Sequence, residues 1–532
     1  MWQNKLNLFK KLVLIFYKFK FILHNRKVFK NADNNQNGVI LVEIHNFYQN
    51  VIPLSYFAQS LAGLHKSEIA GYFPNRAIDF KDKIKKLILI FFPLTRVSLF
   101  SSFGMKKIID VNKYLKIVDK SSIKNYYNFV IKNISKKKII NLKIKGVYIG
   151  DLLYDDYLRK KYVATIDIKN NDFLFFMCDF IKTFYAWDQY FRIEKVKAVI
   201  ISHNTYEYGI PLRIAQKRNI PVYLPDVGRT FYFNNKKKIS LDDVMSNEIF
   251  NSLSKKEKKN FINFSKKKIQ KKFSSKMNTS VEYSKRFIKT IDAKESKYLK
   301  KNNFFPNDKI KILVACHCFY DSPHIFGKFF FNDFLDWLNE LGRISEKTNY
   351  QWYLKKHPHS VNHALANIIL KNFVKKHKKF HIISETEDNR YLSKNIDFVL
   401  TVHGSVAYEY AYLNKPVILA GSPLYFKNYN FCIKPKNKKD YIDTLINLSK
   451  LKYTHINKNE IYFFYFVYNL CLENFGNLLK FRNKLGFFYF SPLIYKHWIK
   501  NMSYAKHLHL LERAKNFLLS KKSLMWNKRL IN

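Results

Sequence analysis

The stretch FVLTVHGSVAYEYAYLNKPVILAG, residues 398–421, decides the fold class of this 532-residue chain. It begins with an apolar run at 398–402, continues with a helical pattern at 406–413 and ends with a second apolar run at 417–420. Two short apolar runs joined by one helix are typical of a strand–helix–strand unit whose strands are parallel and buried. The stretch therefore predicts a parallel α/β sheet.

The same alternation extends toward the N-terminus of this stretch. Alternating strands and helices predict a doubly wound, Rossmann-like domain, which we place at 308–486. Further strands are expected at 311–316, 351–354 and 380–384, and further helices at 331–344 and 361–375.

A second region of the same kind lies earlier in the chain and predicts another Rossmann-like domain at 35–232. The expected architecture is α/β, with two Rossmann-like domains facing a cleft. Around these domains we expect a basic amphipathic segment at 1–34, a Lys-rich helical connector at 233–307 and a helical tail without a sheet pattern at 487–532. In the earlier domain, strands are expected at 38–44, 196–202 and 222–224, and helices at 53–64 and 209–218.

Polar side chains follow three of the strands expected in the 308–486 domain. Because ligands of doubly wound sheets bind beyond the carboxyl ends of the strands, these side chains are the candidates for a binding site. The candidates are His317, Asp321 and His324 after the first strand, Lys356 and His357 after the second, and His403, Gly404, Ser405 and Glu409 after the fourth.

The third group, Gly404, Ser405 and Glu409 after the fourth strand, is suited to binding a nucleotide. Gly404 lets a phosphate approach the backbone closely, and Ser405 offers a hydroxyl and the first free amides of a helix. Glu409 projects from the same helix face as Ser405 and can accept hydrogen bonds from ribose hydroxyls. His357 can donate a hydrogen bond to a leaving phosphate, and Lys356 adds positive potential.

Two of these stretches carry a resemblance to known enzymes. The segments WYLKKHPHS (352–360) and TVHGSVAYEYAYLNKPVILAG (401–421) resemble the donor domain of capsular and surface-polysaccharide glycosyltransferases, which have the GT-B architecture. They also resemble bacterial sialyltransferases. The segments at 317–337 and, more loosely, 149–155 are similar to surface-carbohydrate biosynthesis proteins.

The resemblance implies a transferase that moves a sugar from a nucleotide-activated donor to a surface or capsular glycan. His357 and Ser405 would bind the donor phosphate and Glu409 the ribose, while His317, Asp321 and His324 would face the cleft. His403 belongs to the site without an assigned role. The pairing of an HP motif with a Gly-Ser helix start implies a CMP-linked donor, with UDP and GDP sugars still open.

A general base must come from the acceptor side of such a cleft, and it must be a carboxylate or histidine able to take a hydroxyl proton. The candidates are Asp151 and Asp155, which flank an apolar pair, and His203, which ends the strand at 196–202. Glu207 and Asp226 are weaker alternatives.

The sequence gives no ligands for a metal or a bound cofactor. No Asp-x-Asp triplet occurs, and Cys316 and Cys318 have no second ligand pair at a zinc-like spacing. We therefore expect metal-independent transfer with the nucleotide sugar as substrate. The five scattered cysteines suit a reducing cytoplasm.

The formal net charge is +54, from 94 Lys and Arg against 40 Asp and Glu. Such a field attracts polyanions, but no nucleic-acid-binding signature is present, so no nucleic-acid partner is expected. An anionic membrane surface is the expected macromolecular partner, besides a glycan or glycolipid acceptor. Lysines interrupt the apolar residues of the segment at 1–34, which fits an interfacial helix and an ordinary first helix equally well.

Two rival functions fit the same residues. The first is transfer of a polyol phosphate from a CDP-activated donor on a related scaffold, which would leave a phosphodiester instead of a glycosidic product. The second is a non-catalytic glycan- or membrane-binding subunit, which would bind no nucleotide.

Overall fold

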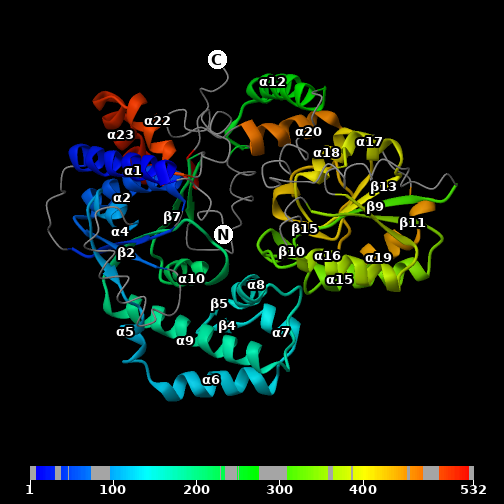
Figure 1. Cartoon of the computed structure of the whole chain (residues 1–532), viewed down its shortest axis with the longest axis horizontal. Helices are drawn as coiled ribbons and strands as arrows, with labels where there is room; N and C mark the ends of the chain where they lie inside the picture. Colours follow the sequence, from blue (N-terminus) through cyan, green and yellow to red (C-terminus); the bar gives the residue numbers. More distant parts are fainter. Residues whose placement is uncertain are drawn as a thin grey trace.

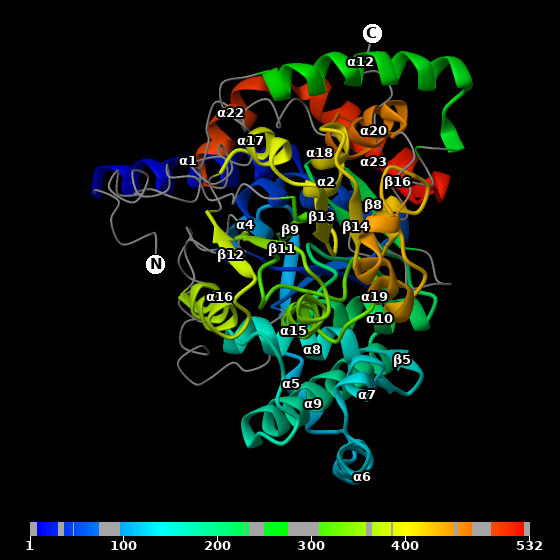
Figure 2. The same cartoon turned by 90° about the vertical axis from the view of Figure 1, so that its right-hand side faces the viewer.

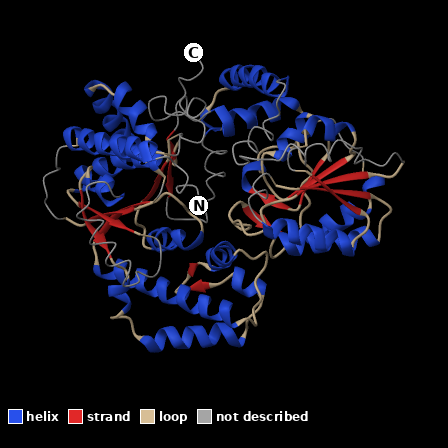
Figure 3. Ribbon diagram, in the orientation of Figure 1, coloured by secondary structure: helices blue, strands red, loops and turns tan. Residues whose placement is uncertain are grey.

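The computed structural model describes residues 8–29, 37–45, 47–73, 96–227, 229–233, 249, 251–274, 308–357, 364–384, 387–451, 456–470 and 491–525. Over these residues the chain is a mixed α/β structure with two largely parallel sheets (Figures 1 and 3). The first-half sheet contains strands from the first half of the chain, and the second-half sheet contains strands that begin at β9.

The second-half sheet has the strand order β12-β11-β9-β13-β14, and all its strands are parallel. If the five strands are numbered by their order in the chain, their order in the sheet is 3-2-1-4-5. The chain therefore proceeds from β9 toward one edge of the sheet and from β13 toward the other edge. A crevice for ligands forms at such a reversal. The strands are β9 (Lys311–Ala315), β11 (Gln351–Lys355), β12 (Phe380–Ile383), β13 (Phe398–Thr401) and β14 (Val417–Leu419).

Helices cover both faces of the second-half sheet (Figure 1). They bury an apolar layer around Trp337, Leu341 and Trp352, each at most 2% exposed. Every strand and helix expected in this region is present, with ends shifted by a few residues. The helices are α15 (Phe334–Glu346), α16 (Ala364–Lys376), α17 (Asn389–Lys394), α18 (Val406–Tyr412) and α19 (Lys438–Ile446).

The first-half sheet repeats this order. Its parallel part runs β7-β6-β1-β2-β3, which is again 3-2-1-4-5 when read from the other edge. The reversal therefore falls between β1 and β6. These strands are β1 (Val39–Glu43), β2 (Glu68–Tyr72), β3 (Met105–Ile109), β6 (Val196–Ile200) and β7 (Val222–Pro225), with β8 (Thr230–Phe233) and β16 (Leu524–Met525) antiparallel at one edge.

A block of helices fills the crossover from β3 to β6 and lies below both sheets in Figure 1. Its core includes Phe184, Trp187 and Tyr190 of α9, all at most 2% exposed. Helix α8 touches the second half, because the Tyr154 hydroxyl donates a hydrogen bond to Oδ2 of Asp333. The block contains α6 (Lys120–Lys132), α7 (Lys136–Ile140), α8 (Gly150–Lys161) and α9 (Asn171–Ile193).

The C-terminal segment returns to the first half. Helices α22 (Leu493–Asn501) and α23 (Tyr504–Ser520) pack on α1 (Leu8–Val28) and α2 (Tyr48–His65), and β16 joins the first-half sheet. The tail expected to be helical contains α22 and α23, and β16 adds a short strand that the sequence pattern did not indicate. A two-residue strand is too short to leave a period in the sequence.

Helix α12 (Lys255–Ser274) is the main described part of the expected connector, and it packs on α20 (Lys458–Tyr465) beside the second half (Figure 2). Most of the connector expected at 233–307 lies outside the described residues. Among the described helices, none combines the length and the apolar character needed to cross a membrane.

Candidate functional site

A cavity of ≈ 560 Å³ lies at the crevice of the second-half sheet, beyond the carboxyl ends of β9, β11 and β13. We call it the β9–β13 cavity. Of the nine binding residues predicted in this domain, only His324 does not line it. Its lining includes His317, Asp321, Lys356, His357, His403, Gly404, Ser405 and Glu409.

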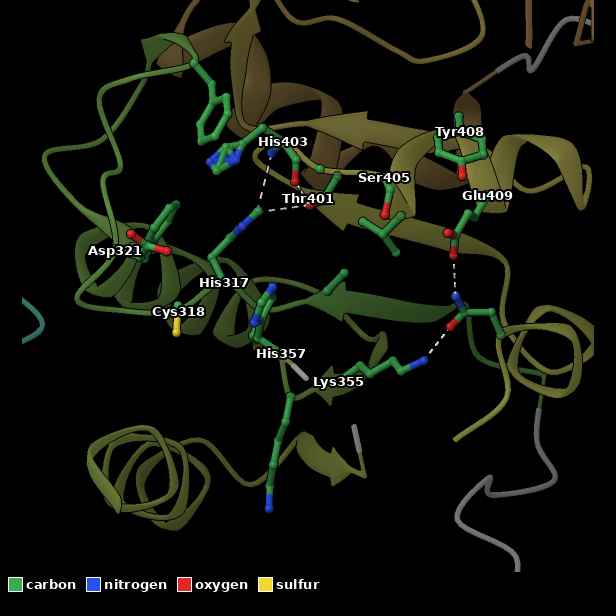
Figure 4. A pocket seen from close by; sticks show the side chains of 18 of the residues that line it. His317, Cys318, Asp321, Lys355, His357, Thr401, His403, Ser405, Tyr408 and Glu409 are labelled. Carbon is green, nitrogen blue, oxygen red and sulfur yellow. Dashed lines mark hydrogen bonds between the residues drawn. The ribbon is translucent and has the colours of Figure 1, made fainter. Parts of the chain in front are cut away.

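Three histidines stand on one side of the cavity (Figure 4). The Nε2 atom of His317 accepts hydrogen bonds from the backbone amides of Val402, at 3.2 Å, and His403, at 3.4 Å. Burial lowers the pKa of His317 well below its usual value, and the neighbouring His403 and His357 lower it further. His317 is therefore a neutral acceptor that fixes the turn after β13.

His403 packs edge-on against Phe326, with ring centroids 4.1 Å apart. Burial lowers its pKa to about 3, so the ring is neutral at physiological pH. Its Nε2 atom is buried and has no hydrogen-bond partner within the protein. A ligand in the cavity can supply that partner, because a buried polar nitrogen is costly to leave unpaired.

The opposite side of the cavity holds a network of charged and polar groups (Figure 4). Lys272 of α12 donates to Oε1 of Glu409 at 3.1 Å and to the Tyr408 hydroxyl at 2.6 Å. Asn389 donates to Oε2 of Glu409 at 2.9 Å and accepts from the Lys355 ammonium group. Both oxygens of Glu409 are thus already held, although each carboxylate oxygen can accept a second hydrogen bond.

The turn after β13 leaves room for a ligand. Gly404 has φ +115°, a conformation that side-chain-bearing residues rarely adopt, and a Cβ built there would meet nothing closer than 3.9 Å. The Ser405 hydroxyl makes no capping hydrogen bond to α18. His357 also lines the cavity, whereas Pro358, the second half of the HP motif, lies outside the described residues.

A second polar group stands at the crevice of the first-half sheet. Glu43, at the end of β1, is buried and accepts hydrogen bonds from the backbone amide and hydroxyl of Ser202, after β6. The Nδ1 atom of His203 lies 2.8 Å from the Ser202 hydroxyl and 3.7 Å from Oε1 of Glu43. The His203 side chain keeps 33% of its surface exposed.

Glu43 is an ionised carboxylate in this arrangement. Burial alone would raise its pKa, but the hydrogen bond and charge of His203, with contributions from His45 and Ser202, bring the pKa below its ordinary value. The sequence indicated His203 but not Glu43, which occupies the last position of an apolar strand. Glu43 could have been predicted, because it is a carboxylate at the carboxyl end of a parallel strand, where ligands of such sheets bind.

The remaining predicted residues are already paired. Asp151 lies in the first turn of α8 and binds Arg213 at 2.9 Å. Asp155 is one turn further along the same helix and is 2.6 Å from Nδ1 of His324, whose Nε2 lies 2.9 Å from the Asn332 carbonyl oxygen. Burial raises the pKa of Asp155, and His324 partly offsets this rise. The Asp155–His324 pair joins the two halves away from the β9–β13 cavity, whereas Asp151 and Arg213 both belong to the first half.

No cluster of metal ligands was found among the described residues. Cys316 and Cys318 are buried, and burial raises the pKa of the Cys316 thiol to about 12. The weaker base candidate Glu207 is buried and paired with Lys160 at 2.6 Å. Asp226 accepts a hydrogen bond from the backbone amide of Val227.

No family model matches the chain, and no curated protein matches it significantly. Among solved structures, KpsC of Thermosulfurimonas dismutans, a beta Kdo 2,4 transferase, is 15% identical over 51% of this chain and 79% of its own, with a TM-score of 0.31. A glycosyltransferase from Rickettsia africae is 12% identical over 91% and 99%, with a TM-score of 0.24.

The UDP-GlcNAc 2-epimerase of Neisseria meningitidis, in a structure bound to UDP-GlcNAc, is 11% identical over 87% of this chain and 98% of its own, with a TM-score of 0.23. TM-scores this low carry no conclusion about the activity of the present chain.

Proposed function

We propose that this chain is a GT-B glycosyltransferase that moves a sugar from a nucleotide-activated donor to a surface or capsular glycan or glycolipid. One observation carries the proposal. A single cavity at the crevice of a 3-2-1-4-5 sheet is lined by residues from three separate strand ends. The sequence pattern predicts that these residues bind a nucleotide sugar. The GT-B architecture has two α/β domains that face each other. The two sheets of this chain are consistent with that architecture.

The donor would place its phosphate between His357, Lys356 and the Gly404–Ser405 turn. The backbone approaches a ligand closely at Gly404, and the Ser405 hydroxyl makes no capping bond that would compete. His357 would donate a hydrogen bond to the leaving phosphate as negative charge develops on it. The ribose would lie toward Glu409, whose carboxylate Lys272 and Asn389 hold in place.

The acceptor would approach from the first-half crevice. Glu43 and Ser202 orient His203 through its Nδ1 atom, which leaves Nε2 as the nitrogen that can take a proton. Asp151 and Asp155 are less suited to this role because each already has a cationic or imidazole partner. We therefore propose His203 as the general base and Glu43 as its positioning residue.

The step balances without a metal or a redox partner. An acceptor hydroxyl oxygen forms a bond to the anomeric carbon of the sugar and gives its proton to Nε2 of His203. The bond between that carbon and the donor phosphate oxygen breaks, and the electron pair stays on the phosphate. We propose that the reaction takes place in the cytoplasm.

A donor screen tests the proposal. The full chain is incubated with CMP-, UDP- and GDP-activated sugars, and release of free nucleotide is measured with and without a crude glycan acceptor. Release from at least one donor, lost in His357→Ala, supports the proposal. A phosphodiester product would instead support the polyol-phosphate rival, and a chain that binds none of the nucleotides would support the non-catalytic one.

A further inference from the structure

Helix α1 is fixed to the body of the protein by one face. Phe21 and Ile22 are at most 1% exposed, and Phe21 stacks on Tyr495 of α22 with ring centroids 3.9 Å apart. The side-chain amide of Asn25 donates a hydrogen bond to the Ser102 hydroxyl at 2.9 Å. Helix α1 therefore lies firmly on α22, at the upper left of Figure 1, with a defined outer face.

Five apolar side chains on this helix are exposed to between 41% and 55% of their surface. Their spacing is i, i+3, i+4, i+7 and i+11, so at 3.6 residues per turn they fall within an arc of about 100°. We call this set the α1 stripe. It consists of Leu12, Ile15, Phe16, Phe19 and Leu23.

Cations accompany the stripe. Lys20, Arg26 and Lys27 are exposed, and the ammonium group of Lys20 lies 4.5 Å from the centroid of the Phe16 ring. The chain as a whole carries a formal charge of +54. An occupant of this face must accept apolar side chains and, beside them, a strong positive field. A second copy of the chain would bring the same charge to the same place, so self-association is opposed.

We propose that the α1 stripe docks on the surface of an anionic membrane, with its apolar side chains in the boundary between headgroups and acyl chains. An amphipathic helix whose apolar face is bordered by basic residues binds in this way, parallel to the membrane plane. Lys20, Arg26 and Lys27 then lie at the level of anionic headgroups. This inference goes beyond the proposed transfer reaction and does not depend on it.

Co-sedimentation with lipid vesicles tests the inference on the full chain. One set of vesicles is phosphatidylcholine alone, and the other also contains phosphatidylglycerol, whose anionic headgroups attract basic segments. The wild-type protein should sediment with the anionic vesicles. The double variant Phe16→Glu/Phe19→Glu should lower the partition coefficient by at least about tenfold, because charges replace two aromatic rings that would enter the membrane surface.

The chain offers a matched control. Phe129 on α6 and Phe175 on α9 are 65% and 71% exposed, so Phe129→Glu/Phe175→Glu makes the same chemical change and the same change in net charge elsewhere on the surface. This control should bind vesicles like the wild type. Circular dichroism and the melting temperature of both variants establish that each one is folded.

Three results would overturn the inference. The wild type could fail to bind anionic vesicles, or the stripe variant could bind them as well as the control variant does. Alternatively, sedimentation velocity could show a dimer for the wild type and a monomer for the stripe variant, while the stripe variant still binds vesicles. The last result would assign the stripe to contact between copies of the chain. None of these results bears on nucleotide release by the second half.

Discussion

The Tyr206 hydroxyl donates a hydrogen bond to Oδ1 of Asp321 and lies 2.8 Å from the hydroxyl of Ser322. Tyr206 follows β6 of the first-half sheet, and Asp321 follows β9 of the second-half sheet and lines the β9–β13 cavity. The two crevices are therefore connected through one side chain. Tyr206 has φ +55°, an unfavourable value for a bulky residue, which is typical of strained positions at functional sites.

Replacing Tyr206 by Phe should reduce turnover more than it reduces nucleotide binding. The lost hydrogen bond joins the two halves and is worth about 1 kcal/mol, or about fivefold in rate. Tyr206 itself does not line the cavity that would hold the nucleotide, so the variant removes no residue that would contact the nucleotide. Steady-state kinetics and nucleotide titration measure the two effects. A larger loss of nucleotide affinity than of turnover would contradict this assignment.

His357→Ala should abolish turnover and leave the fold intact. We expect a loss of about 10²–10³ in turnover, the range found when a donor to a developing negative charge is removed. His381 on β12 gives a control, because it belongs to the same sheet without lining the cavity. Activity close to wild type in His357→Ala, with His381→Ala unaffected, would exclude the HP motif from the mechanism.

Activity should persist in excess EDTA. Lys272, Lys355 and Lys356 line the cavity, and their positive charge can stabilise a leaving phosphate without a divalent ion. The measurement is nucleotide release before and after chelation. Complete loss of activity that magnesium or manganese restores would disprove metal independence.

CMP or CDP should raise the melting temperature more than UDP or GDP at equal concentration. A ligand present at about 100 times its dissociation constant stabilises the folded chain by about 2.7 kcal/mol, which gives a readable shift. The expectation comes from the resemblance of the HP and Gly-Ser motifs to sialyltransferases. A larger shift with UDP or GDP would rule out the cytidine donor and leave the GT-B proposal in place.

His403 should make the fold less stable in acid. Its folded pKa is lowered to about 3 by burial, whereas the unfolded chain takes up the proton near the ordinary value of 6.5. As pH falls below this value, only the unfolded state binds the proton, so the free energy of unfolding decreases until pH approaches the folded pKa. One such group contributes at most about 1.4 kcal/mol per pH unit.

Urea unfolding at about pH 7 and at about pH 5 checks this prediction, since the fall in pH crosses the unfolded pKa of 6.5 and stops well above the folded pKa of about 3. His403→Gln should lose less stability over the interval than the wild type. His317 keeps part of the acid sensitivity in the variant, because its pKa is also lowered by burial. Equal losses in the two proteins would show that His403 is protonated in the folded state.

The strands that formed continuous apolar runs could be predicted from the sequence, since burial on both faces leaves a clear pattern. The runs at 38–44 and 311–316 are β1 and β9. Strand β3 (Met105–Ile109) could not be predicted in the same way. It lies at the edge of its sheet with Lys106 and Lys107 exposed, so it resembles a loop.

The candidate site was predictable where its residues directly follow a strand. His357 and Ser405 were found in this way, Glu409 was found from its place on the same helix face as Ser405, and all three line the β9–β13 cavity. Lys272 was not predicted, because it belongs to a Lys-rich helix in which no local pattern marks the one lysine that pairs with Glu409. Contacts between residues far apart in the chain depend on packing, which no local pattern records.

The return of the C-terminal segment to the first half has a consequence for biosynthesis. Strand β16 pairs with β8, and Trp498 and Phe517 complete the core around α2, yet a ribosome makes these residues after the entire second-half sheet. Domains usually fold in the order in which they are translated. Here the second half can finish folding first, while the first half waits for its last strand and exposes apolar surface that chaperones can recognise.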